Sequence, residues 1–110
     1  VVGDGYAACA SRTPESEVFD AAALAAELRV RAWEPGDRLV PFGRSSPVKL
    51  QDLFTDAHVP RAERQQFPVI LSAGTIIWVP GLRRAEFGRA ERGRPAVVLR
   101  RVAAGRGDPR

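Results

Sequence analysis

The sequence predicts one strand-rich α+β domain with short helices. Its 110 residues suit a single domain and leave no room for two. The hydrophobic share of 45% is typical of a globular chain rather than a disordered one. Alternating strand patterns, separated by Pro-Gly turns and short amphipathic stretches, show no strand–helix–strand repeat. No apolar run approaches the roughly 20 residues that a membrane-spanning helix needs.

The first quarter of the chain predicts a strand, a loop and a short helix. Residues 5–10 fit a short strand, and Pro14 marks a loop over residues 11–16. Asp20 is expected to cap an alanine-rich helix over residues 21–26, because a short carboxylate can accept hydrogen bonds from free N–H groups of a first turn.

Residues 28–33 alternate with a period of two, which predicts a half-buried strand. The two faces would be formed by Leu28, Val30 and Ala32 against Arg29, Arg31 and Trp33. Residues 34–37 (Glu-Pro-Gly-Asp) predict a tight turn, since proline pre-sets the second position and glycine permits the positive φ of a type II turn at the third. A second strand over residues 38–41 should follow.

Two short helices are predicted next. Ser46 is expected to cap a helix over residues 47–56, with an apolar stripe formed by Leu50, Leu53, Phe54 and Ala57 and with Lys49, Asp52 and Asp56 facing away. Pro60 suits the first turn of another helix over residues 60–66, which would place Arg61, Arg64 and Gln65 on one face.

The last third predicts a hairpin and a final strand. Residues 69–71 and 75–79 read as strands around Ser72-Ala73-Gly74, with Gly74 at the left-handed position. Pro80-Gly81 signals another turn. The basic, glycine-punctuated stretch 83–94 is expected to be a mobile loop, followed by a strand over residues 96–102 and a disordered tail over residues 104–110.

Charge is unevenly distributed along the chain. The net charge is +4, with five acidic residues and one basic residue in 1–28 and the other 16 basic and 8 acidic residues in 29–110. Lys49 is the only lysine. The planar guanidinium of arginine suits phosphate oxygens and stacks on bases, which agrees with nucleic-acid binding. A solvated basic surface explains the same count, so charge alone leaves both interpretations open.

The residues that carry most enzyme chemistry are scarce. The single cysteine, Cys9, excludes an intrachain disulfide and a cysteine-rich metal cage, and it agrees with a reducing, cytoplasmic location. Cys9 and the lone His58 lack any local activating group. Residues 3–8 match a dinucleotide fingerprint but lack the preceding strand. The opening at Val1 shows no signal peptide, and the chain is expected to be a fragment of a longer protein.

Several short motifs occur in a defined order. They are LRVRAWEPGDR at 28–38, PFG at 41–43, KLQDLFTD at 49–56, VPR at 59–61 and IWVPGLR at 77–83. This series resembles the C-terminal domain of bacterial tRNA(Ile)-lysidine synthetase. The resemblance extends from about residue 18 to residue 102, and the domain is expected to span residues 1–103.

The resemblance implies a fold and a function. The family ligates lysine to the wobble cytidine of an isoleucine tRNA with a CAU anticodon, using ATP with magnesium. That chemistry belongs to an N-terminal part with a Ser-Gly-Gly-x-Asp-Ser loop, which is absent from this sequence. The fragment is therefore expected to bind tRNA on its acceptor-stem side without catalysis, cofactor, metal or membrane, beside the catalytic part of the same protein. The implied fold is a layered, β-sandwich-like domain similar to one in the phenylalanyl-tRNA synthetase β subunit.

Five basic residues match the family's positions and are the RNA-binding candidates: Arg31, Arg38, Lys49, Arg64 and Arg83. Two departures weaken the match on the first helix, because Val48 replaces the first residue of a Lys-Lys pair and His58 stands where a lysine is usual. Basic residues at 89, 92 and 94 are candidates to compensate.

Two other function classes remain open. The domain could be a packing module that docks on the catalytic part of the synthetase and touches little RNA. An editing-type hydrolase is suggested only by the shared fold, and the missing nucleophile, base and metal ligands argue against it.

Overall fold

The computed structural model describes residues 2–4 and 16–101. The strands are β1 (Val2–Asp4), β2 (Ser16–Asp20), β3 (Leu28–Ala32), β4 (Arg38–Leu39), β5 (Val48–Lys49), β6 (Pro68–Ser72), β7 (Thr75–Val79), β8 (Arg83–Arg84) and β9 (Pro95–Arg100). The helical elements are the 3-10 turns η2 (Ala21–Ala23) and η3 (Arg61–Gln66) and the α-helix α2 (Leu50–Asp56). None of the described helices is long and apolar enough to cross a membrane.

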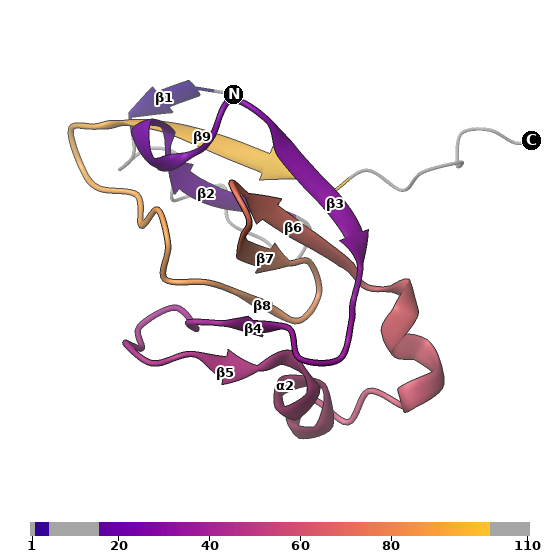
Figure 1. Ribbon diagram of the computed structural model, residues 1–110. Helices are drawn as coiled ribbons and strands as arrows, with labels where there is room; N and C mark the ends of the chain where they lie inside the picture. Colours follow the sequence, from indigo (N-terminus) through magenta and orange to yellow (C-terminus); the bar gives the residue numbers. More distant parts are fainter. Residues whose placement is uncertain (1, 5–15, 102–110) are drawn as a thin grey trace, which may run out of the picture.

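Three antiparallel sheets form the domain (Figure 1). A four-stranded sheet in the order β3-β6-β7-β8 lies at the centre. A three-stranded sheet in the order β1-β9-β2 packs against one of its faces. The two-stranded β4–β5 ribbon and α2 pack against the other face. The predicted class, a layered α+β domain with short helices, is therefore confirmed.

Strand β7 contributes to both cores and contains a bulge. Its partners on β6 step from Ile70–Trp78 to Leu71–Ile76, which leaves Ile77 as an extra residue. Ile76 and Val79 consequently face the ribbon side, and Ile77 and Trp78 face the three-stranded sheet. All four residues are buried, because both faces of this strand are covered, and the bulge places two successive residues on the same face.

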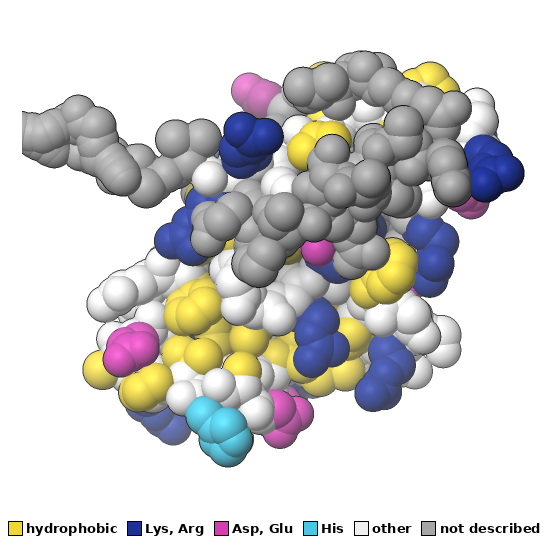
Figure 2. Space-filling model, turned by 180° about the vertical axis from the view of Figure 1, so that it is seen from behind, with side chains coloured by type: hydrophobic (Ala, Val, Ile, Leu, Met, Phe, Trp, Pro, Cys, Tyr) yellow, Lys and Arg dark blue, Asp and Glu magenta, His cyan; other side chains and the backbone are white. Residues whose placement is uncertain are grey.

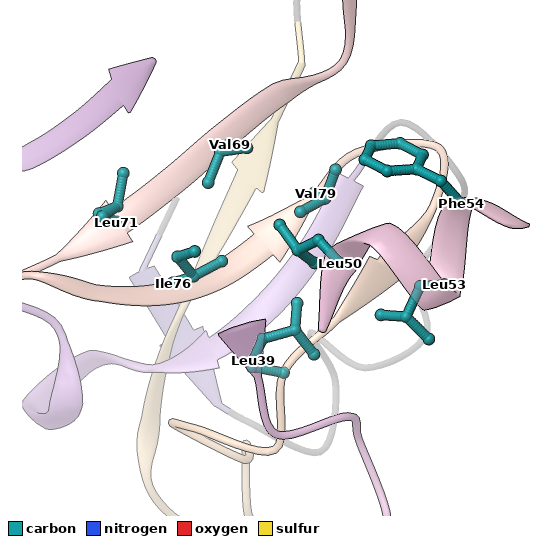
Figure 3. Packing of buried hydrophobic residues seen from close by; sticks show 9 residues of the cluster. Leu39, Leu50, Leu53, Phe54, Val69, Leu71, Ile76 and Val79 are labelled. Carbon is teal, nitrogen blue, oxygen red and sulfur yellow. The ribbon is translucent and has the colours of Figure 1, made fainter. Parts of the chain in front are cut away.

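The larger core lies between the central sheet and the ribbon (Figure 3). Side chains of β6 and β7 point toward those of β4 and α2, and the members shown are Leu39, Leu50, Leu53, Phe54, Val69, Leu71, Ile76 and Val79. Leu50 and Phe54 are fully buried. Each such side chain contributes about 1.5–3 kcal/mol of burial free energy, so α2 is held by its apolar face despite having only seven residues.

The two Pro-Gly turns form as predicted, and the predicted hairpin has a two-residue turn in place of the expected Ser72-Ala73-Gly74 loop, because Ser72 belongs to β6. The Asp37 N–H donates to the Glu34 carbonyl at 3.1 Å, and Gly36 has φ +96°. The hairpin between β6 and β7 has Ala73 and Gly74 at its centre, with φ of +50° and +86°. Positive φ at both central residues defines a type I′ turn, whose twist matches that of the flanking strands.

Several local predictions are wrong. The predicted helix over 21–26 is a three-residue 3-10 turn that Asp20 does not cap. Instead, the Asp20 carboxylate accepts two hydrogen bonds from Arg94, at 3.0 and 3.1 Å. Residues before Asp20 form β2, which the sequence did not predict. The strand predicted over 5–10, the residue Cys9 and the tail from 102 lie outside the described residues.

The first predicted helix begins later than expected. Residues Val48 and Lys49 form β5, and α2 starts at Leu50 with no side-chain cap, so Ser46 plays no capping role. Of the predicted apolar stripe, Leu50, Leu53 and Phe54 are buried, whereas Ala57 is exposed. The second helix is the 3-10 turn η3.

Candidate nucleic-acid interface

Asp37 connects the Pro-Gly turn to three neighbouring segments. Its carboxylate accepts two hydrogen bonds from Arg31, at 2.8 and 3.0 Å, and one from the Glu34 N–H at 2.8 Å. Its carbonyl accepts a hydrogen bond from the Leu50 N–H, the first residue of α2, at 2.9 Å. The turn, strand β3 and the start of α2 are therefore held together by one residue.

The electrostatics of this contact favour the charged pair. Partial burial by itself raises the Asp37 pKa, but the hydrogen bonds from Arg31 and from the Glu34 N–H outweigh it, and the pKa lies below its usual value. The hydrogen bond to Asp37 raises the Arg31 pKa. Arg31, a candidate RNA contact, thus already has an anionic partner inside the domain, although a third of its side chain remains exposed.

Arg38 and Lys49 are brought together by the β4–β5 ribbon. They are direct cross-strand partners, so their side chains leave the same face of the ribbon. The neighbouring pair, Leu39 and Val48, points to the opposite face and packs in the larger core. Both cations are exposed, and neither makes an ion pair within residues 16–101. We call this cross-strand pair the basic ribbon face.

A cavity of about 580 Å³ lies next to the basic ribbon face. Arg31, Asp37 and Arg38 line one part of it, and Glu86 and the hairpin residue Gly74 line another. Three of the five candidates, Arg31, Arg38 and Lys49, therefore gather around the Pro-Gly turn and the adjoining ribbon. Residues far apart in the sequence form this region because β4 pairs with β5 and turn 34–37 contacts α2.

Arg64 has a different environment from the ribbon cations. It is 8% exposed, and its guanidinium donates to the Val59 carbonyl at 3.2 Å and to the Thr55 hydroxyl at 3.4 Å. It also lies over the ring of Phe54, 5.5 Å from the centroid. The face that the sequence predicted for Arg61, Arg64 and Gln65 is therefore divided, since Arg64 points inward and the other two are exposed.

Arg83 and Arg84 are adjacent on β8 but occupy opposite environments. Arg83 is exposed and makes no ion pair within residues 16–101. Arg84 is 5% exposed and donates to the carbonyls of Val18, Ala85 and Phe87. We call the contacts of Arg84 the Arg84 seam.

The Arg84 seam joins two layers of the domain. The Arg84 guanidinium lies between the rings of Phe19 and Phe42, 4.3 and 4.8 Å from their centroids. It also forms an ion pair with Glu17 at 3.5 Å. Phe19 and Glu17 belong to β2 of the three-stranded sheet, so this arginine ties that sheet to the central one.

Two arginines of the basic stretch 83–94 have internal carboxylate partners. Arg89 donates to Glu86 at 2.8 and 3.0 Å, and Glu86 also accepts a hydrogen bond from the Gly43 N–H at 2.7 Å. The hydrogen bonds from Arg89 and Gly43 lower the Glu86 pKa to about 2. Arg94 is held by Asp20. The sequence marked two of the three partner carboxylates for other roles, Asp37 in the turn motif and Asp20 as a helix cap, and it did not single out Glu86.

The two tryptophans are part of the packing. Trp78 is 4% exposed in the smaller core, and Trp33 packs edge-on against Phe54 with centroids 5.7 Å apart. The structure places both rings against the cores, so the exposed groups available to a ligand are basic side chains. Figure 2 shows Lys and Arg side chains around an apolar area on one face of the molecule.

The domain resembles known proteins in sequence and in structure. The sequence model of the family described as "TilS substrate C-terminal domain" matches residues 28–101. A tRNA(Ile)-lysidine synthase of Geobacillus kaustophilus is 40% identical over 83 residues, which are 74% of this chain and 18% of the relative. One from Symbiobacterium thermophilum is 39% identical over 89 residues, covering 80% and 18%. The chain thus spans less than a fifth of these relatives.

Solved structures agree with this match. The crystal structure of a TilS C-terminal domain superposes with a TM-score of 0.68 and 33% identity, over 84% of this chain and 75% of that one. An N-terminal fragment of the phenylalanyl-tRNA synthetase β subunit from Pyrococcus horikoshii superposes with a TM-score of 0.64 at 15% identity, over 76% and 26%. The second likeness concerns the fold alone. In the described part of the chain, no group of three or more His, Cys, Asp or Glu side chains could hold a metal ion.

Proposed function

Because this chain belongs to the TilS substrate C-terminal domain family, we propose that it is a tRNA-binding module of a tRNA(Ile)-lysidine synthase. The module would hold the tRNA on its acceptor-stem side, so that the wobble cytidine reaches a catalytic site elsewhere in the cytoplasmic enzyme. Fixing the substrate in this way raises the effective concentration of the reacting groups. The substrate proposed is an isoleucine tRNA with a CAU anticodon.

The basic ribbon face is the observation that carries this proposal. Like charges placed directly opposite each other on a sheet destabilise it, yet Arg38 and Lys49 occupy such a pair with no carboxylate to neutralise them within residues 16–101. A phosphate placed between them would relieve this repulsion. Arg83 is a further exposed candidate, whereas Arg31 and Arg64 are already engaged inside the domain.

Catalysis is proposed to lie outside this chain. The sequence has no Ser-Gly-Gly-x-Asp-Ser loop that could hold ATP, so the residues present do not fit that cofactor and no ATP-dependent step is assigned to them. ATP with magnesium would act in the catalytic part of the parent enzyme. Phosphate contacts by this domain would position the RNA, and contacts to shape or base edges would select it.

Binding measured over a range of salt concentrations tests the proposal. The 110-residue chain should bind isoleucine tRNA, and log affinity should fall with log salt by about 0.7–0.9 for each phosphate neutralised. Arg38→Gln and Lys49→Gln should each lower that slope by about one such contact. Arg100→Gln is the matched control, because Arg100 is an exposed cation in the sheet on the opposite side of the domain.

Two results would contradict the proposal: absence of tRNA binding at low salt, or a flat dependence of affinity on salt. Equal losses in Arg38→Gln and Arg100→Gln would place the RNA contact elsewhere. A methionine tRNA titrated in parallel measures how much discrimination this domain adds.

A further inference from the structure

The central sheet has an open edge at β3. Within the described residues, β3 pairs only with β6, so its other side presents unpaired backbone groups. The edge carries Val30, which is 64% exposed and is the only large hydrophobic residue so exposed among the described residues. An edge strand that exposes an apolar side chain is a template for pairing with another strand.

The hairpin geometry shows which backbone groups point outward. The two-residue turn makes Ser72 and Thr75 a hydrogen-bonded pair, so the N–H and C=O of Ser72 face β7 and not β3. Its partner on β3, Leu28, is therefore in a pair without hydrogen bonds. By alternation, the backbone groups of Val30 and Ala32 also face away from the sheet. The Ala32 carbonyl accordingly accepts a hydrogen bond from the Arg31 side chain at 3.1 Å.

The same edge borders an apolar groove of about 580 Å³. Its floor and walls include Val30, Phe67, Ile70, Trp78 and Leu99. Among the described residues, the ionisable side chains that line it are Arg31, Arg100 and Arg101, all basic. A ligand that fits this groove therefore places apolar side chains against its apolar lining and negatively charged groups beside the arginines.

Strand addition explains these features together. A strand added antiparallel to β3 would place every second side chain over the groove, beside Val30. The intervening side chains would lie beside Arg29 and Arg31 on the other face of the sheet. Arg29 is exposed and makes no ion pair within residues 16–101. A second copy of β3 does not fit, because pairing centred on Val30 would set Arg29 opposite Arg31.

We infer that the β3 edge and its groove bind an extended segment of a protein partner in which apolar and acidic residues alternate. The partner's backbone would hydrogen-bond to the outward-facing groups of Val30, and its acidic side chains would meet the surrounding arginines. Arg31 borders both this groove and the cavity beside the basic ribbon face, but neither Arg38 nor Lys49 lines the groove. Binding at the β3 edge therefore does not depend on RNA binding. An RNA strand fits less well, because its charged phosphates do not pack against an exposed valine and do not pair with a strand edge as a peptide backbone does.

Designed peptides test the proposal by fluorescence anisotropy with the 110-residue chain. A ten-residue peptide that alternates glutamate and valine should bind, whereas an alternating lysine–valine peptide and a block peptide of five glutamates and five valines should bind at least tenfold more weakly. N-methylation of the valines should abolish binding, because their N–H groups face β3. N-methylation of the glutamates should preserve it, because theirs face away.

Variants of the chain complete the test. Val30→Glu should lower affinity for the acidic peptide at least tenfold and leave tRNA affinity unchanged, and Ala22→Glu, also at an exposed site, should change neither. Arg38→Gln should leave peptide binding unchanged, so failure here is distinguishable from failure of RNA binding. No binding of the acidic peptide at millimolar concentration, equal binding of both N-methylated peptides, or loss of tRNA affinity in Val30→Glu would overturn the proposal.

Discussion

The Arg84 seam and the basic ribbon face use the same kind of side chain for opposite purposes. Arg84 is 5% exposed, stacked between two aromatic rings and hydrogen-bonded to three carbonyls, so its charge is satisfied inside the protein. Arg38 and Lys49 stand side by side in solvent without a carboxylate partner within residues 16–101. A count of basic residues treats these regions alike, whereas burial and partners separate a structural cation from one available to a ligand.

The largest expected effect is at the Arg84 seam. Arg84→Leu should lower the free energy of unfolding by about 3–5 kcal/mol, because three carbonyls lose their buried donor and the ion pair with Glu17 is removed. Arg83→Leu, one residue earlier, should change it by less than about 0.5 kcal/mol. Urea denaturation of both variants gives the difference. Similar losses in the two would mean that Arg84 is not the residue that joins the layers.

The sequence grouped Arg64 with the RNA contacts, and substituting it tests whether it stabilises the fold instead. Arg64→Ala should destabilise the fold by about 1–3 kcal/mol, because the Val59 carbonyl loses its donor and Phe54 loses the guanidinium above it. Arg61→Ala, on the same 3-10 turn but exposed, is the control. An unchanged stability together with a salt slope for tRNA binding lowered by about 0.7–0.9 would instead assign Arg64 to the RNA surface.

Asp37, in the turn beside the basic ribbon face, makes stability depend on pH. Its folded pKa lies below the unfolded value of about 3.9, so its stabilising contribution is complete above that value and is lost as pH falls through the folded pKa. Asp37→Asn should cost about 1–2 kcal/mol at pH 7 and make stability less dependent on pH below about 5. Stability curves from pH 2 to 7 measure this, with Asp52→Asn on the exposed face of α2 as the control. Parallel curves for Asp37→Asn and the parent chain would refute it.

The smallest expected effect is a gain in stability. Lys49→Glu replaces a like-charged cross-strand pair with an ion pair to Arg38, which should raise stability by about 0.2–1 kcal/mol. The same change should weaken tRNA binding, because it replaces a cation with an anion. Thermal unfolding and salt-dependent binding of one variant therefore separate the two roles. A variant that loses stability and keeps its RNA affinity would place the contact elsewhere.

The sequence predicted features that depend on neighbouring residues. The strand at Thr75–Val79 and the turns at 34–37 and 73–74 follow from local alternation and from glycine and proline, and the structure contains them. Strand β2 could not be found in this way, because it exists through pairing with β9, nearly eighty residues later. Strand β5 likewise depends on its partner β4 and shortens the helix that local spacing predicted.

The candidate site was predictable in part. Matching motif positions identified Arg38 and Lys49 separately, but only the ribbon register makes them neighbours. The burial of Arg64 depends on the packing of η3 against Phe54 and Thr55, which no local pattern indicates. Arg94 and Arg84 bind Asp20 and Val18, which are distant in sequence. Local patterns therefore could not show that these arginines have partners inside the domain.

The bulge at Ile77 has a consequence for how the domain comes apart. One strand supplies Ile76 and Val79 to one core and Ile77 and Trp78 to the other, so neither core can open without disturbing the backbone of its neighbour. We expect the described layers to melt in a single calorimetric transition and the amides of β6 and β7 to exchange their hydrogens last. Removing residue 77 would restore the strict alternation of the strand and leave Trp78 facing the three-stranded sheet. The smaller core would lose one buried side chain, and the strand would still join the two cores.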